Sequence, residues 1–233
     1  MTNIGKELFP KMCAAIAAAH AAAGIEDGPF PMALSYSVAR FAHELAEVHH
    51  PDLVRLAVAS ALCRNARRII EKVQGVERAD PGDVEVLVAS WLDTEDSLTP
   101  CQRAQIIRAV QRHSGPNDMA DSMLDVVLKD AHRLAHLCPI VVVRATRLYE
   151  NLQGGLQVLN YDGREGTFKD PPSIIDDLRG NLVWAETKGG EFSIRLPHAR
   201  ALARHLATTL RNFIDLLIEE EVAAGNYVEP IAK

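Results

Sequence analysis

Three arginines stand close together where a long apolar run ends. Residues 56–70 read LAVASALCRNARRII, so that Arg64, Arg67 and Arg68 follow a stretch typical of a core helix. Guanidinium groups bind phosphate through paired N–H donors, and the cluster therefore predicts an anion site. The alternative is a solvated helix end, where cations favour the negative pole of the helix dipole.

A second segment with potential ligand-binding residues is VVLKDAHRLAHL at 126–137, in which Asp130 lies inside an apolar run. His132 and His136 follow at i, i+4 spacing, which would let one helix present both imidazoles to a metal. A solvated or capping pair is the plainer interpretation of the same spacing. The residues expected to contact a bound anion are Arg64, Arg67, Arg68, His113 and Arg133.

Several common catalytic motifs do not occur. The chain has no GxxxxGK[ST], GxGxxG or GxSxG segment, and HELAE at 43–47 is not HExxH because Glu47 replaces the second histidine. Phosphate cradling by a glycine-rich loop and a nucleophile elbow are therefore not indicated.

Helical patterns account for most of the chain and would position these side chains. In the segment 32–49, apolar residues at 34, 38, 41, 45 and 48 fall on one face. Asp80-Pro81 and Thr99-Pro100 are start signals in which a capping residue precedes proline. We predict helices over 4–23, 32–49, 51–73, 80–91, 99–113, 121–151 (kinked or split at Pro139) and 197–224.

Residues 153–197 differ in character, being rich in Gly, Pro and Asp. Short extended segments are expected at 156–161, 182–186 and 191–196, with Gly189-Gly190 as a hairpin turn. This segment has too few apolar residues for a core of its own, and we interpret it as a flap inserted before the last helix. The sequence thus predicts a single all-α domain over 1–233 that carries an irregular or β flap at 153–197.

Composition narrows the classes of partner. The net charge of −6 gives no general attraction to nucleic acid or to an anionic membrane. No apolar stretch approaches the roughly 20 residues that span a bilayer, and the Ala-rich N-terminus predicts a helix rather than a signal peptide. The four cysteines have no CxxC spacing and are interpreted as reduced thiols of a cytoplasmic protein.

With these segments in view, the order and spacing of the motifs resemble those of small bacterial HD-domain phosphohydrolases. That family is all-α and holds a divalent metal with a His, a His-Asp pair and a later Asp. The resemblance runs from about 30 to 225, with 153–197 poorly matched. The segments that carry it are LSYSVA (34–39), ASALCRN (59–65), AVQRHS (109–114), DAHRL (130–134) and the closing helix from RLPHARALARHL onward.

At the metal-ligand positions the chain departs from the family. The resemblance places the ligands at Leu34, Cys63, Arg64 and Asp130, and only Asp130 keeps the family's residue type. A cation among the ligand positions opposes a divalent metal, and without the metal no water of lowered pKa is generated. We therefore expect no metal cofactor. A buried carboxylate that has lost its metal needs another cation, and the resemblance predicts an Arg64–Asp130 ion pair in its place. The alternative is that Arg64 turns outward and Asp130 bonds to backbone or water.

Three functional hypotheses follow. The first is a degenerate HD-domain protein, without hydrolase activity, that binds a phosphorylated small molecule or a protein partner. The second is an active metal-dependent phosphohydrolase whose altered site, built from Cys63, His113 and Asp130 with His132, would favour Zn²⁺ or Fe²⁺. The third is a structural module that forms a homodimer.

Overall fold

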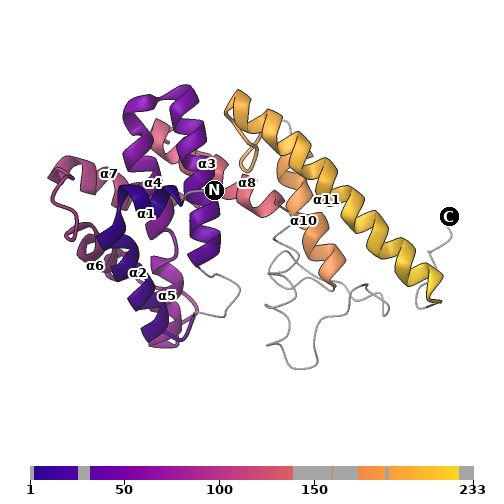
Figure 1. Ribbon diagram of the computed structural model, residues 1–233, viewed down its shortest axis with the longest axis horizontal. Helices are drawn as coiled ribbons and strands as arrows, with labels where there is room; N and C mark the ends of the chain where they lie inside the picture. The colour runs from indigo at the N-terminus through magenta and orange to yellow at the C-terminus, as the bar shows by residue number, and fades with distance from the viewer. Residues whose placement is uncertain (1–2, 26–31, 139–158, 160–172, 187–188, 226–233) are drawn as a thin grey trace.

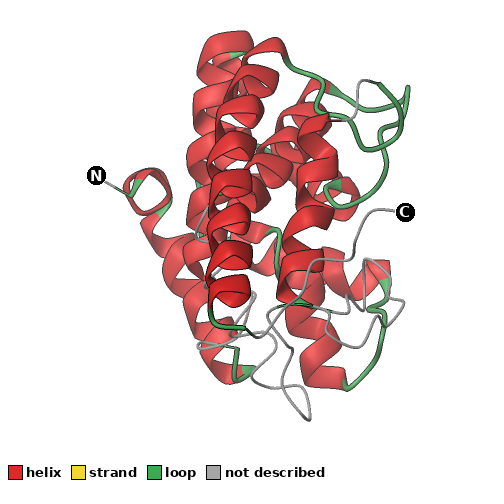
Figure 2. Cartoon of the chain, turned by 90° about the vertical axis from the view of Figure 1, so that its right-hand side faces the viewer, coloured by secondary structure: helices red, strands yellow, loops and turns green. Residues whose placement is uncertain are grey.

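Capping residues and prolines determine where the main helices begin. The computed structural model describes residues 3–25, 32–138, 159, 173–186 and 189–225. Within these ranges the chain is an all-α bundle and contains no strand (Figures 1 and 2). The helices are α1 (Ile4–Leu8), α2 (Pro10–Ala22), α3 (Met32–His49), η1 (Pro51–Leu53), α4 (Val54–Cys63), α5 (Ala66–Gln74), α6 (Pro81–Leu92), α7 (Pro100–Arg112), α8 (Met123–Leu137), α10 (Ile174–Glu186) and α11 (Pro197–Ala223).

The core forms where α3 packs against α4 and α8. Helices α1, α2 and α5–α7 surround this centre on one side, while α10 and α11 lie side by side and extend away from it (Figure 1). Leu62, Leu128 and Leu134 are among the side chains fully removed from solvent. Burial of this kind is the main favourable contribution to folding.

Four predicted helices are confirmed, and they are α3, α6, α7 and α11. Helix α3 covers 32–49, α6 begins after Asp80, whose carboxylate accepts from the Gly82 N–H, and α7 begins with a capping box at Thr99. The inward face of α3 is as predicted except at Val48, which is 56 % exposed because the helix ends there at the surface.

Two predicted helices are split. The segment 4–23 breaks at Phe9, ahead of Pro10, because proline cannot continue the helix that precedes it. The segment 51–73 becomes η1, α4 and α5, with the second break at Arg64 and Asn65. That break changes the environment of the arginine cluster.

The prediction of β-strands in the flap is wrong at the positions that the structure describes. Residues 182–186 belong to helix α10, whose face carrying Ile175, Leu178 and Leu182 is buried. Residues 191–196 form no strand, and Gly189 and Gly190 both have positive φ in a bend. The predicted strand at 156–161 and the helical segment beyond Pro139 lie outside the residues described.

Two further expectations can be compared with the structure. Cys13, Cys63, Cys101 and Cys138 are all free thiols, as predicted. Across the described ranges, none of the helices combines the length and apolar character that crossing a membrane requires.

Candidate anion-binding site

The break between α4 and α5 places Arg64 inside the protein. Arg64 follows the last residue of α4, Asn65 precedes the first residue of α5, and the two are only 4 % and 2 % exposed. The positive dipole end of α5 therefore lies in this region, next to the C-terminal end of α4.

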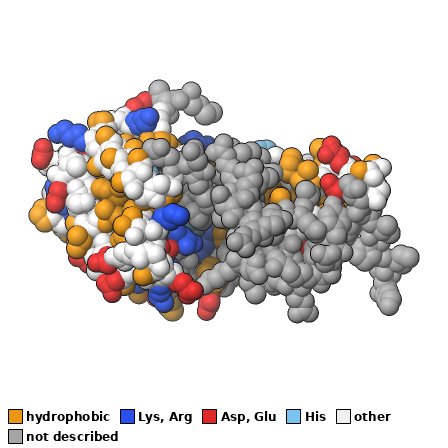
Figure 3. Space-filling view, turned by 90° about the horizontal axis from the view of Figure 1, so that it is seen from below, with side chains coloured by type: hydrophobic (Ala, Val, Ile, Leu, Met, Phe, Trp, Pro, Cys, Tyr) orange, Lys and Arg blue, Asp and Glu red, His pale blue; other side chains and the backbone are white. Residues whose placement is uncertain are grey.

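Arg67 and Arg68 lie in the first turn of α5, not in the last turn of a longer helix. Cations in a first turn are repelled by the positive end of the dipole, so the interpretation as a favourable helix C-terminus does not hold for Arg67 and Arg68, whereas Arg64 does cap the C-terminus of α4. Both guanidinium groups contact the buried Glu71, Arg67 at 2.6 Å and Arg68 at 3.0 Å, while their side chains stay 45 % and 54 % exposed. Seen from the end of the molecule where α5 lies, Lys and Arg side chains gather near the middle (Figure 3).

Three imidazoles meet beside Arg64. The His113 and His132 rings are 5.1 Å apart edge to face, and His132 and His136 are 4.7 Å apart. His113 comes from the end of α7 and the other two from α8, so packing of α7 on α8 creates the cluster. Trp184 of α10 lies 5.5 Å from His136, centroid to centroid.

The hydrogen-bond partners define the tautomers of two rings. His113 Nδ1 lies 2.7 Å from the Val110 carbonyl oxygen, which only accepts, so Nδ1 carries the proton. His132 Nδ1 lies 3.5 Å from Nη1 of Arg64, which only donates, so in the neutral ring Nε2 carries the proton. His132 therefore has an N–H donor directed away from Arg64.

The electrostatic field at His113 is positive. Burial lowers the pKa of His113 to about 4, and the guanidinium groups of Arg64, Arg67 and Arg68 lower it as well. Burial also holds the pKa of His132 well below its ordinary value, with His136 and Arg64 adding to the effect. Both rings are therefore neutral near pH 7, and the cationic charge of the site comes from arginine.

Asp130 does not belong to this cluster. Its carboxylate accepts from the backbone N–H of Arg195 at 2.9 Å and of Leu196 at 2.7 Å, just ahead of α11. The nearest described cation is Arg133, at 3.7 Å. Burial raises the Asp130 pKa to about 6, although these amides favour the charged form.

The predicted Arg64–Asp130 ion pair is therefore wrong. Within the part of the chain that the structure describes, Asp130 forms an ion pair with Arg133 and Arg64 contacts His132. Asp130 instead bonds to backbone, as the alternative expected, through amides at the start of α11, whereas Arg64 is buried and not turned outward. Asp130 stabilises the docking of α11 on α8.

Arg133, an expected anion contact, is engaged elsewhere. Its Nη1 donates to Asn117 Oδ1 at 2.9 Å and to the Ser193 carbonyl at 2.8 Å, and its side chain is 3 % exposed. These bonds join the loop after α7 to the loop before α11. Of the five expected anion contacts, Arg64, Arg67 and Arg68 all lower the pKa of His113. Arg133 also lowers the pKa of His132, but its N–H groups are used by Asn117 and Ser193.

The positions that the resemblance assigns to metal ligands are core or docking residues. Leu34 is 2 % exposed, and Cys63 is fully buried with its Sγ 3.8 Å from the Met12 sulfur. Burial raises the pKa of Cys63 well above that of an ordinary thiol, which disfavours the thiolate that a metal needs. In the described ranges no group of three His, Cys, Asp or Glu side chains has a geometry that could hold a metal, and this applies to Cys63, His113 and Asp130.

Two groups were missed by reasoning from the sequence. Asp121 and Lys129 form a buried ion pair at 2.8 Å, and Arg112 and Arg195 also contact Asp121. His20 is the second, an imidazole 2 % exposed on α2. His20 does interrupt an alanine-rich run, and that interruption was the available signal.

Comparison with known proteins adds no relative: no family model, no curated protein and no solved structure matches this chain.

Proposed function

We propose that this protein binds the phosphate group of a phosphorylated small molecule at the Arg64 site, which we define as Arg64, Arg67, Arg68, His113 and His132. On this proposal the chain is a degenerate HD-like helical protein that binds its ligand without a metal and does not hydrolyse it. The resemblance of the five sequence segments supports the HD-like origin.

One observation carries the proposal. The guanidinium groups of Arg64, Arg67 and Arg68 all lower the pKa of the buried His113, and Arg67 and Arg68 do so from the first turn of α5, where cations oppose the helix dipole and a bound anion would offset them. Glu71 accepts from two of the three but lies within the helix, on its buried side. A phosphate at this helix end would interact with the guanidinium groups, the α5 amides and the Nε2–H of His132 together.

The test is calorimetric titration of the purified protein with inorganic phosphate, a sugar phosphate and adenosine 5′-monophosphate. We expect binding with one site per chain, and a Kd raised at least tenfold in R67Q/R68Q, because two guanidinium contacts are lost. The matched control is R204Q, which removes one charge from the exposed face of α11 and should change Kd less than twofold. Failure of the wild-type protein to bind any of the three would refute the proposal.

A further inference from the structure

Acidic and basic side chains are segregated along α11. The first half of the helix contains Arg200, Arg204 and Arg211 and no acidic residue, whereas the second half contains Asp215 and the glutamates at 219–221 and no Lys or Arg. This order opposes the helix dipole, because acidic groups are favourable near a helix N-terminus and basic groups near a C-terminus. The charges of α11 are therefore not arranged to stabilise the helix alone.

Four charged side chains of α11 form one exposed stripe, and they are Arg200, Arg204, Asp215 and Glu219. With the exposed positions 208 and 211 between them, the spacing is four, four, three, four and four residues, which keeps the stripe on one side of the helix. The structure gives these four no ion-pair partner among the residues it describes, whereas Arg211 pairs with Glu186 at 2.6 Å. Helix α11 extends away from the bundle, so this stripe faces outward (Figure 1).

The stripe is complementary to itself when it is reversed. Positions 200 and 219 are equally far from the point midway between 209 and 210, and so are positions 204 and 215. A second α11 that runs antiparallel about this point places a carboxylate opposite each of the two arginines. In a two-fold interface residue i contacts residue j of the other copy and j contacts i, so every such pair forms twice.

The same antiparallel arrangement compensates the unfavourable dipole interactions. It brings the glutamates of the last turns near the positive N-terminal end of the other helix, and Arg200 near its negative C-terminal end. A partner of uniform charge would match only one half of α11 and repel the other half. Among possible partners, a second copy of this chain matches both halves at the observed spacing.

We propose that the exposed face of α11 is an interface with a second copy of this chain, in which the two α11 helices pair antiparallel. Arg200 of each copy pairs with Glu219 of the other, and Arg204 pairs with Asp215. Leu216, which is 50 % exposed beside Asp215, adds apolar contact. Exposed ion pairs contribute little individually, so the dimer is reversible and the charges mainly fix its orientation.

This interface is independent of the proposed function, because no residue of the Arg64 site lies on α11. The alternative is a solvated helix face that has no partner. Sedimentation velocity of the full chain over a range of protein concentrations separates the two. We expect a monomer–dimer equilibrium whose Kd rises at least tenfold between about 50 mM and about 500 mM NaCl, as the Debye length falls from about 14 Å to about 4 Å.

Charge reversal tests the pairing itself. Because each substitution alters two symmetric pairs, R204E alone and D215R alone should each raise the dimer Kd at least tenfold. An equimolar mixture of R204E and D215R should dimerise within about threefold of the wild-type Kd, because position 204 of one copy then faces position 215 of the other with opposite charge at both ends. The controls K11E and E85R reverse exposed charges on other helices and should leave the dimer Kd unchanged.

Three results would overturn the inference. A wild-type protein that is monomeric at every concentration has no such interface. A dimer that tolerates both charge reversals uses another surface. If R204E and D215R each dissociate and their mixture does not associate, the antiparallel register is wrong. Circular dichroism of each variant shows that α-helix content is retained, and none of these results affects phosphate binding at the Arg64 site.

Discussion

At the scale of single residues, Arg64 determines the chemistry of the site. Its guanidinium lies against His132 and lowers the pKa of the neighbouring imidazoles. Because those rings stay neutral, they contribute directed donors and acceptors instead of charge. An anion that enters gains its Coulomb attraction from arginine, which remains protonated at any physiological pH.

The first prediction concerns the pH dependence of stability through His113. Its pKa is about 4 in the folded protein against 6.5 for the unperturbed ring, so the folded state binds fewer protons between these values. The resulting stabilisation is present above pH 6.5 and is lost as pH falls toward 4. From pH 7 to pH 5 the loss due to this ring is about 2 kcal/mol.

Urea unfolding of wild type and H113Q at both pH values tests this. Asp130 contributes with the opposite sign, because its raised pKa favours the folded state at the lower pH. Asp130 is present in both proteins, so the difference between wild type and H113Q gives the contribution of His113 to the change in the free energy of unfolding. We expect the free energy of unfolding of H113Q to fall by less than that of wild type, and H205Q should behave like wild type.

At the scale of elements, polar contacts between loops fix how α11 docks on α8. Asp130 accepts from the two amides that precede α11, and Asn117 donates through Nδ2 to the Ser193 carbonyl at 2.9 Å. Asp121 accepts from Arg195 at 2.8 Å. The loop after α7 and the loop before α11 are therefore joined to each other and to α8.

The second prediction is that Asp130→Ala destabilises the protein by about 3 kcal/mol, because two buried backbone N–H groups lose their acceptor. Asp130→Asn keeps one acceptor oxygen and should lose less. Chemical denaturation at pH 7 gives both values. The exposed Asp96→Ala should stay within about 0.5 kcal/mol of wild type, and an equal loss there would refute a specific role for Asp130.

The third prediction concerns Lys129, whose side chain is 1 % exposed. Its Nζ donates to Asp121 at 2.8 Å and to the Pro116 carbonyl at 2.5 Å. Lys129→Met removes one partner of a buried pair, which typically costs about 3–5 kcal/mol. Lys11→Met is the exposed control and should be nearly neutral, so a Lys129→Met protein as stable as wild type would contradict this account.

Local signals made part of the fold predictable, and distant contacts made the rest unpredictable. Asp80 and Thr99 cap α6 and α7 as their sequence context indicates. The break at Arg64 contains neither Gly nor Pro, so no local signal marks it. Residues 182–186 include Val183 and Trp184, which favour strands, but packing of α10 on α11 made them helical.

The candidate site was predictable in its composition but not in its geometry. The arginine cluster and His113 were visible from residue types alone. The partners of Asp130 lie 65 and 66 residues further along the chain, so only the fold reveals them. The hydrogen bonds of Arg133 to Asn117 and Ser193 could not be predicted either, because they also depend on the fold.

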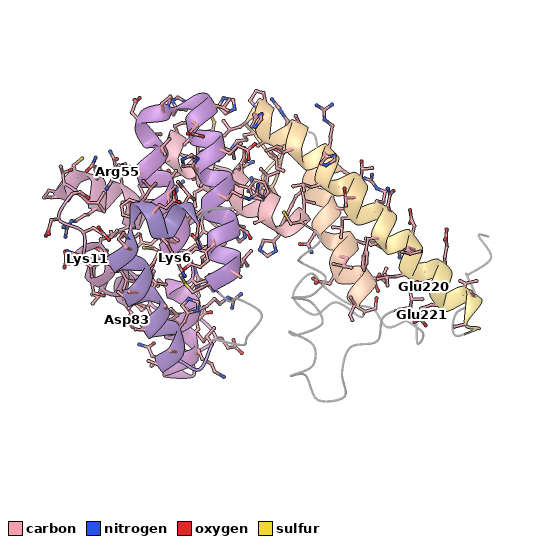
Figure 4. The ribbon with its side chains drawn as sticks, viewed as in Figure 1. Lys6, Lys11, Arg55, Asp83, Glu220 and Glu221 are labelled. Carbon is pink, nitrogen blue, oxygen red and sulfur yellow. The ribbon has the colours of Figure 1, made fainter. Side chains whose placement is uncertain are left out.

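At the level of the whole molecule, the end of α11 carries acidic side chains far from α5. Lys6, Lys11, Arg55 and Asp83 lie on the part that contains the N-terminal helices, whereas Glu220 and Glu221 lie toward the far end of α11 (Figure 4). The overall charge of −6 therefore does not describe the surroundings of α5. A small anion would meet the guanidinium groups of the Arg64 site locally, within about one Debye length of 8 Å at physiological salt.

We propose that this helical protein binds phosphate through arginine and without a metal. Titration of inorganic phosphate into the full chain, in the presence of excess EDTA, tests it most directly. We predict saturable binding at one site per chain with the same Kd with and without the chelator. Binding that disappears in EDTA and returns with one equivalent of a divalent ion would contradict the account.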